Sequence, residues 1–182
     1  MKIIGISGSH RDGGNSEEIL KYVLKIFEKH GIETNLISLR NLKIKPCAEC
    51  WMCLERGFCI LDDDFGYLCS EITDSSGIII STPVFFNGVS GLTKIFMDRT
   101  WSIRGRLKNK VGGAIVVGRR YGHEAALANL IAFFLKHEMI LGDRGLVCYA
   151  YHREDLKEDK LCYLEAKRFA RRILELLELR KI

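Results

Sequence analysis

Four cysteines lie close together in the segment CAECWMCLERGFC, which covers residues 47–59. They are Cys47, Cys50, Cys53 and Cys59. Two residues separate Cys47 from Cys50 and Cys50 from Cys53, and five residues separate Cys53 from Cys59. These spacings are short, so one loop can turn all four thiols toward a common centre. The pattern therefore indicates a shared site, and the possible occupants differ in the spacing that they require.

A disulfide framework is the first possibility, and it is typical of small secreted domains that lack an adequate core. The cysteine count of seven is odd, and the N-terminal sequence MKIIGISGSH does not have the charged and apolar pattern of a signal peptide. No apolar run approaches the length that spans a membrane. We therefore expect a cytoplasmic protein with reduced thiols and no membrane partner.

Metal binding is the other possibility. Structural zinc usually uses two Cys-x-x-Cys pairs that are set about a dozen residues or more apart. Successive Cys-x-x-Cys-x-x-Cys turns with one further cysteine favour a [4Fe-4S] cluster instead. In bacterial ferredoxins the fourth cysteine precedes a proline and binds a second cluster. Here Ile60 follows Cys59 and no second run exists, so we predict one cluster per chain, with structural zinc as the alternative.

The composition is that of one ordinary globular domain. The chain has 182 residues, of which 47% are hydrophobic and 28% are charged. A net charge of +5 is only mildly basic and does not indicate nucleic-acid binding. We therefore predict a single domain over residues 1–182, with an insertion at 41–62 that carries the cysteines.

Strand and helix patterns alternate along the chain. The predicted strands cover residues 2–7, 33–39, 77–81, 111–117 and 146–151. The predicted helices cover residues 16–30, 63–73, 88–99, 124–137 and 155–179. This alternation predicts an α/β fold with a doubly wound, five-stranded parallel sheet in the flavodoxin-like order 2-1-3-4-5, and the cysteine-rich loop is inserted after the second strand.

Open parallel sheets bind ligands beyond the carboxyl ends of their strands. The loop after the first strand, SGSHRDGGNS, leads directly into a helix, whose N-terminal amides attract phosphate. The loop has neither G-x-G-x-x-G nor the lysine of a nucleotide loop, because Gly14 stands in the lysine position. A mononucleotide such as FMN therefore fits best, and a simple glycine turn with a helix cap at Asn15 or Ser16 is the alternative. The candidate phosphate-binding residues are Ser7, Ser9, Arg11, Gly14, Asn15 and Ser16.

Two further loops are expected at the same edge. The loop after the third strand offers an apolar and aromatic wall followed by a polar turn, which suits a flat flavin ring, although packing explains the aromatics equally well. Its candidate residues are Pro83, Val84, Phe85, Phe86, Asn87 and Gly88. The loop after the fourth strand offers Arg119, Tyr121 and Gly122.

Together, the first loop, the stretch TPVFFNGVSGLTKIFMDR and the cysteine motif resemble the iron-sulfur flavoproteins. This resemblance implies FMN, one [4Fe-4S] cluster and electron transfer. It assigns Cys47, Cys50, Cys53 and Cys59 to the cluster, Ser9, Arg11, Asn15 and Ser16 to the phosphate, and residues 83–88 to the flavin ring. His10 and the Gly122-His123 pair depart from the pattern of relatives.

The resemblance also implies a role. Electrons would pass from a one-electron donor such as ferredoxin, through the cluster and FMN, to a small-molecule acceptor, in a homo-oligomer that is a dimer or a tetramer. No catalytic acid or base stands out, since cofactors carry such chemistry. One alternative is an NADPH-dependent FMN or quinone reductase with a structural zinc loop, and another is a non-enzymatic, metal-dependent interaction module. The remaining cysteines, Cys69, Cys148 and Cys162, are expected to be buried apolar thiols.

Overall fold

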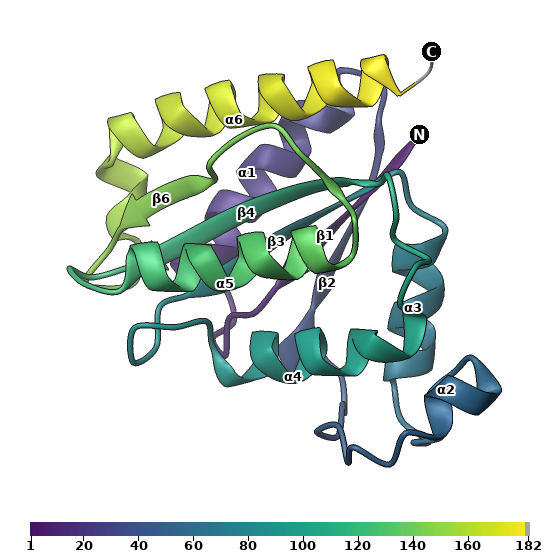
Figure 1. The fold of residues 1–182 in the computed structure, drawn as a ribbon. Helices are drawn as coiled ribbons and strands as arrows, with labels where there is room; N and C mark the ends of the chain where they lie inside the picture. Colours follow the sequence, from purple (N-terminus) through teal and green to yellow (C-terminus); the bar gives the residue numbers. More distant parts are fainter. Residues whose placement is uncertain (181–182) are drawn as a thin grey trace.

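The protein is described by a computed structural model that covers residues 1–180. Its centre is a parallel sheet with the order β2-β1-β3-β4-β5, in which β6 also pairs with β4 (Figure 1). The strands are β1 (Lys2–Ser7), β2 (Glu33–Ser38), β3 (Gly77–Pro83), β4 (Val111–Gly118), β5 (Ile140–Leu141) and β6 (Leu146–Tyr149). The flavodoxin-like order predicted from the sequence is confirmed.

The fifth position of the sheet differs in detail from the prediction. β5 pairs with Val111 and Gly112 at the start of β4, and β6 pairs with the stretch from Ile115 to Gly118 at its end. Two short strands therefore share the outer edge of β4. A two-residue strand is too short to produce a pattern in the sequence, so only the second one was predicted.

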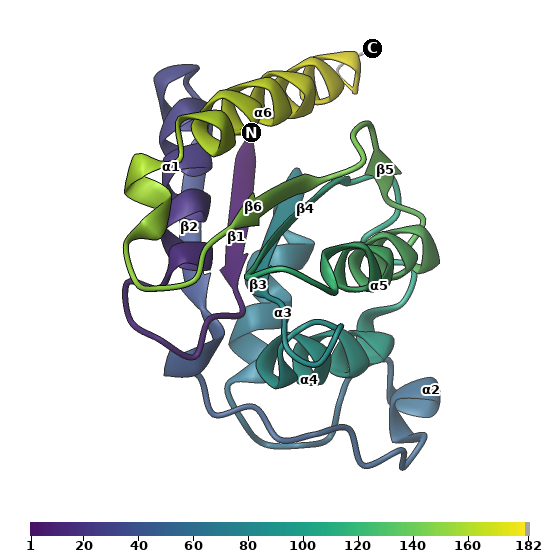
Figure 2. The same cartoon turned by 90° about the vertical axis from the view of Figure 1, so that its left-hand side faces the viewer.

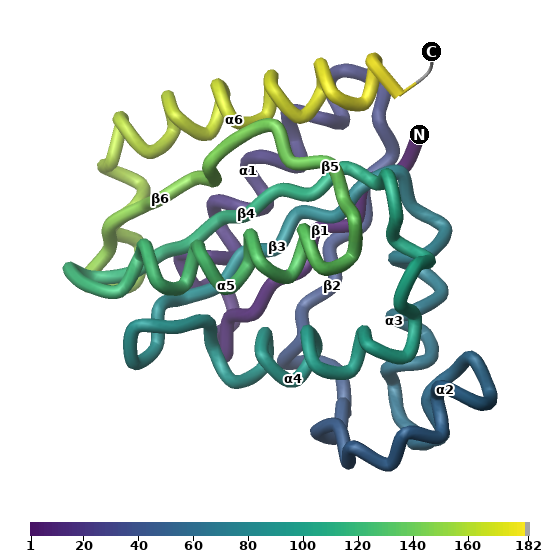
Figure 3. The backbone as a smooth tube through the Cα atoms, viewed as in Figure 1, coloured from purple at the N-terminus to yellow at the C-terminus, as the bar shows by residue number. Residues whose placement is uncertain are grey.

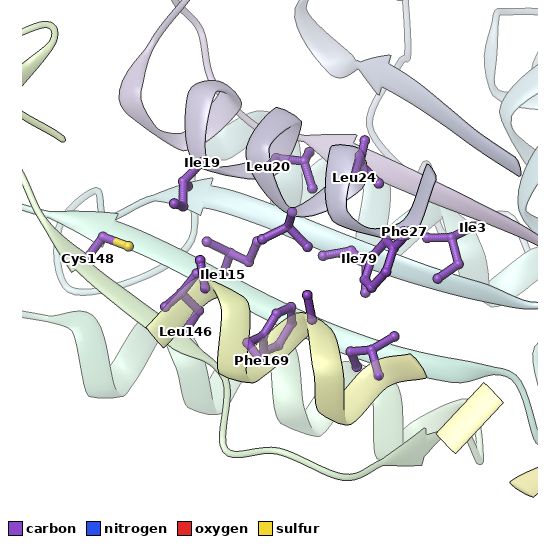
Figure 4. Close-up of a cluster of buried hydrophobic side chains, with 14 of the residues drawn as sticks. Ile3, Ile19, Leu20, Leu24, Phe27, Ile79, Ile115, Leu146, Cys148 and Phe169 are labelled. Carbon is purple, nitrogen blue, oxygen red and sulfur yellow. The ribbon is translucent and has the colours of Figure 1, made fainter. Parts of the chain in front are cut away.

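Helices cover both faces of the sheet (Figure 2). The first face carries α1 (Asn15–Lys29) and α6 (Lys160–Leu179), and the second carries α3 (Phe65–Thr73), α4 (Gly91–Arg99) and α5 (His123–Lys136). Figure 4 shows Phe27 of α1 and Phe169 of α6 meeting Ile79 and Ile115 of the sheet. The strands read as continuous apolar runs because both of their faces are buried.

The register places several strand ends at one edge. Ser7 is paired with Ser81, and Pro83 is paired with Val117. The loops that follow β1, β3, β4 and β6 therefore leave the sheet side by side, which is the arrangement that a ligand pocket requires.

Cys148 of β6 and Cys162 of α6 form a disulfide in the interior, with their Cα atoms 5.6 Å apart. The prediction that both are free thiols was therefore wrong. The two residues lie on different elements that pack together only in the folded chain, so their individual apolar surroundings gave no sign of the pairing. Cys69 on α3 is a free, partly buried thiol.

The chain between η1 (Leu39–Asn41) and α3 leaves the sheet and returns to it, as the tube in Figure 3 shows. It contains one short helix, α2 (Met52–Arg56). Its two ends are fastened together, because the backbone amide of Lys43 donates to Asp64 at 2.6 Å and that of Lys45 donates to Asp63 at 2.9 Å. Among the described helices, none is long and apolar enough to cross a membrane.

Candidate functional site

A cavity of about 200 Å³ opens at the carboxyl edge of the sheet. Residues of four loops and of the first turn of α1 surround it. They are Ser9, His10, Arg11, Gly14, Asn15, Ser16, Pro83, Val84, Phe85, Val117, Gly118, Arg119, Ala150, Tyr151 and Arg153. We refer to it as the edge pocket. It contains most of the residues predicted for the phosphate and flavin-ring loops.

The loop after β1 is shaped by its own hydroxyl and glycine. The Ser9 hydroxyl donates to the carbonyl of Arg11 at 2.9 Å and accepts from the amide of Arg11 at 3.1 Å. A Cβ atom added at Gly14 would lie 2.6 Å from the Ser9 Oγ, so a larger residue there would displace the Ser9 hydroxyl. The alternative of an ordinary side-chain cap was wrong, because Gly14 is the N-cap of α1 and no side chain caps this helix. The first amides of α1 remain available to an anion.

Ser7 does not line the edge pocket. It is fully buried at the end of β1, and its Oγ accepts a long hydrogen bond of 3.4 Å from the amide of Ser9. Ser7 therefore contributes to the shape of the loop after β1 through this hydrogen bond and does not face the edge pocket.

The loop after β3 forms a tight turn. Phe85 and Gly88 exchange backbone hydrogen bonds of 2.9 and 3.0 Å, and Phe86 and Asn87 between them have positive φ angles of 46° and 59°. Phe85 reaches the edge pocket, where the ring of His10 stacks on it at 5.3 Å between centroids. Phe86 is fully exposed at the tip of the turn. Of the six residues predicted here, Phe86, Asn87 and Gly88 do not line the edge pocket.

In the loop after β4, Arg119 lines the edge pocket, whereas Tyr121 is exposed and lies outside its lining. Gly122 has a φ of +83°, and a Cβ atom there would lie 2.6 Å from the Cα of Asn87. Gly122 thus lets this loop lie directly against the turn at Asn87 and against Val84, which lines the edge pocket.

The loop after β6 supplies pocket residues that the sequence reasoning missed: Ala150, Tyr151 and Arg153. The guanidinium of Arg119 lies 5.7 Å from the centroid of the Tyr151 ring. The predicted last strand, residues 146–151, included Ala150 and Tyr151, whereas β6 ends at Tyr149, so these two residues were assigned to the sheet and not to a loop at its edge.

The four clustered cysteines are free and line a second cavity of about 490 Å³. We refer to it as the cysteine cavity. Its other walls include Trp51, Arg99, Trp101 and Ser102. Within residues 1–180, no group of three or more His, Cys, Asp or Glu side chains is gathered closely enough to hold a metal ion. The structure thus brings the four thiols to one cavity without drawing them into a ligand sphere.

Cys69 is chemically different from these four. Burial raises the pKa of its thiol to about 12, so the thiol stays protonated at neutral pH. It lines a neighbouring cavity, together with Cys59, and does not line the cysteine cavity.

Comparisons with known proteins agree with this geometry. Residues 1–151 match the family described as NADPH-dependent FMN reductase. An iron-sulfur flavoprotein of Methanocaldococcus jannaschii is 36% identical over 192 aligned residues, which cover all of both chains. The structure of RosB with bound 8-demethyl-8-formylriboflavin-5'-phosphate superposes with a TM-score of 0.82 at 14% identity, over all of this chain and 80% of that one. An archaeal flavodoxin superposes with a TM-score of 0.67 at 16% identity, over 98% and 99% of the two chains.

Proposed function

Because the chain belongs to the NADPH-dependent FMN reductase family and, within it, to the iron-sulfur flavoproteins, we propose that it transfers electrons between FMN in the edge pocket and a [4Fe-4S] cluster in the cysteine cavity. The observation that carries the proposal is that both cavities lie where the sequence motifs require them, one at the carboxyl edge of the sheet and one among four free thiols.

The edge pocket supports FMN through its polar end and its apolar wall. The uncapped first turn of α1, with Ser16 and the nearby Arg11, would hold the phosphate. Val84 and Phe85 would cover one side of the flavin ring, and Tyr151 would lie across from the phosphate loop. Bound FMN supplies electron transfer in steps of one or two electrons.

The cysteine cavity suits an iron-sulfur cluster by its donor chemistry. Four free cysteines in the order Cys-x-x-Cys-x-x-Cys, followed by one more, are the ligand set of such a cluster, and a cluster supplies one-electron transfer. Metal ligation would draw Cys47 and Cys50, which are exposed, together with Cys53 and Cys59.

The proposed electron donor is a small acidic protein of the ferredoxin type, and the acceptor is a small molecule. Exposed cations lie beside the cysteine cavity: Arg56 on α2 and Arg106 line the neighbouring cavity that shares Cys59, and Arg104 lies over the ring of Trp101. The chain as a whole carries a net charge of +5. Opposite charge on the donor would speed its encounter with this side of the molecule.

We also propose a homo-oligomer. Phe86 is fully exposed on a turn with positive φ angles, and Phe85 beside it is 48% exposed. An exposed aromatic pair next to the edge pocket would be covered by a second subunit. Light scattering tests this proposal, and a monomer at micromolar concentration would contradict it.

Anaerobic purification with measurement of iron, acid-labile sulfide, zinc and FMN tests the cofactors. We expect one FMN and one [4Fe-4S] cluster per chain. Zinc without sulfide, together with steady NADPH oxidation, would favour the reductase alternative, for which the family match is the supporting observation. A colourless protein without flavin would leave only the interaction module.

A further inference from the structure

A buried ion pair lies between the cysteine cavity and the helices of the second face. Arg99, the last residue of α4, pairs with Asp63, and their side chains are 1% and 2% exposed. Arg99 donates to the two carboxylate oxygens of Asp63 at 2.6 and 3.1 Å and to the carbonyl of Lys45 at 2.7 Å. Its guanidinium lies 4.6 Å from the centroid of the Phe65 ring.

Packing alone does not account for this pair. Removing two charges from water is costly, and a well-packed apolar pair in the same place is often at least as stable. Arg99 also has five N–H groups, and only three of them donate to the oxygens of Asp63 and Lys45 given above. Its Nε atom is buried and has no hydrogen-bond partner among the described residues. A buried donor without an acceptor is rare and points to a role.

Arg99 is also part of the wall of the cysteine cavity. Arg99 lines that cavity together with all four cysteines. Arg99 and Cys59 also line the neighbouring cavity together, whereas Cys47, Cys50 and Cys53 do not. Cys59 is therefore the cysteine on which the arginine acts.

We propose that Arg99 is a positioning residue that raises the reduction potential of the group bound by the four cysteines, acting through the sulfur of Cys59. The inference rests on the proposed [4Fe-4S] cluster. When such a cluster takes one electron from its donor, no bond forms or breaks and its charge becomes one unit more negative. A buried cation beside a ligand sulfur stabilises that reduced state, since solvent screens it weakly. Asp63 opposes this effect in part and holds the guanidinium in place.

The test is a redox titration of the cluster followed by electron paramagnetic resonance in the anaerobically purified holoprotein. Arg99→Gln should lower the midpoint potential, and Arg99→Lys, which keeps the charge, should move it less. Asp63→Asn should raise it, because the opposing charge is gone. Arg104→Gln is the matched control, since it removes one cation from an exposed position near the same cavity, where water screens it, and should leave the potential unchanged.

A double variant controls for loss of folding. Arg99→Gln leaves Asp63 buried without a partner, whereas the double variant Arg99→Gln with Asp63→Asn removes both charges and leaves neither group ionised. The double variant should retain iron and sulfide and still show a midpoint below that of the wild type. Equal midpoints in the wild type, Asp63→Asn and the double variant would overturn the inference and leave the proposed cluster intact. A wild-type chain without iron and sulfide would instead overturn the proposed function, and the inference with it.

Discussion

Asn15, which lines the edge pocket, is joined to His152 by a hydrogen bond. The Asn15 amide donates to the carbonyl of His152 at 2.7 Å, and its oxygen accepts from the backbone of Glu154 at 3.1 Å. The first residue of α1 therefore holds the loop after β6 against the phosphate loop. Arg153 adds a third link by donating to the carbonyl of Asp12 at 3.1 Å.

We predict that Asn15→Ala weakens FMN binding. The substitution removes both hydrogen bonds, so the loop that carries Tyr151 is no longer held in place. The free energy of FMN binding should weaken by about 1 kcal/mol or slightly more, which corresponds to a roughly tenfold higher Kd. Quenching of flavin fluorescence measures the Kd of FMN. The control is Asn41→Ala, an exposed asparagine at the end of η1, which should leave the Kd unchanged. Equal Kd values for the two variants would contradict the role of the links.

Gly14→Ala should impair FMN binding more than it impairs folding. The new Cβ atom would meet the Ser9 Oγ at 2.6 Å and force the phosphate loop to shift, so we expect a Kd at least about tenfold higher. Gly91→Ala at the start of α4 is the matched control, because nothing lies within 4 Å of the added atom. Titration with FMN and thermal melts of both apoproteins separate the two effects. Tight binding by Gly14→Ala would show that the loop relaxes freely.

Reduction of the Cys148–Cys162 disulfide should lower the free energy of unfolding by about 2–3 kcal/mol, as expected for a crosslink that closes a loop of 14 residues. The same loop carries Tyr151 and Arg153 of the edge pocket, so FMN should protect the reduced protein in part. Melts with and without a reductant, on the wild type and on Cys148→Ala, provide the measurement. If a reductant lowers the Tm of Cys148→Ala as much as the Tm of the wild type, this prediction is contradicted.

Stability should fall as the pH falls below about 6.5, and His137 is the cause. Burial lowers the pKa of its imidazole, with Lys136 adding to the effect. The unfolded chain therefore binds a proton that the folded chain does not, between the ordinary pKa and the lower one, and stability is lost over that range. His137→Gln should show a shallower dependence of Tm between pH 7 and about 5, whereas His30→Gln, at an exposed position, should keep the wild-type slope. Identical slopes in all three proteins would assign the dependence to other groups.

The sequence predicted those features that depend on local pattern. The buried strands are continuous apolar runs and the glycine-rich loop before α1 follows the first of them, so the alternation of strands and helices and the phosphate loop were both predictable. The first residues of the helices were harder to predict. The helix predicted from residue 88 begins at Gly91, because Phe85 and Gly88 close a turn and the Ser90 Oγ accepts from the amide of Thr93.

Pairings between distant residues could not be predicted. Asp63 was assigned to a helix that begins at Phe65, and its actual role is to bind Arg99, which lies 36 residues away. The helix predicted from residue 155 begins at Lys160, where Asp159 caps it by accepting from Cys162. That same cysteine pairs with Cys148, and nothing in the local composition of either residue reveals its partner.

The fastening of Lys43 and Lys45 to Asp64 and Asp63 has a consequence for how such a protein could arise. The two ends of the cysteine segment meet at one place, so residues can be added or removed between them with little change in the cost of closing the loop. A parallel sheet of this kind could therefore acquire the cysteine segment in a single event, without rearranging its strands. The same hydrogen bonds make the cysteine segment a candidate for transfer into another flavodoxin-like scaffold that lacks it.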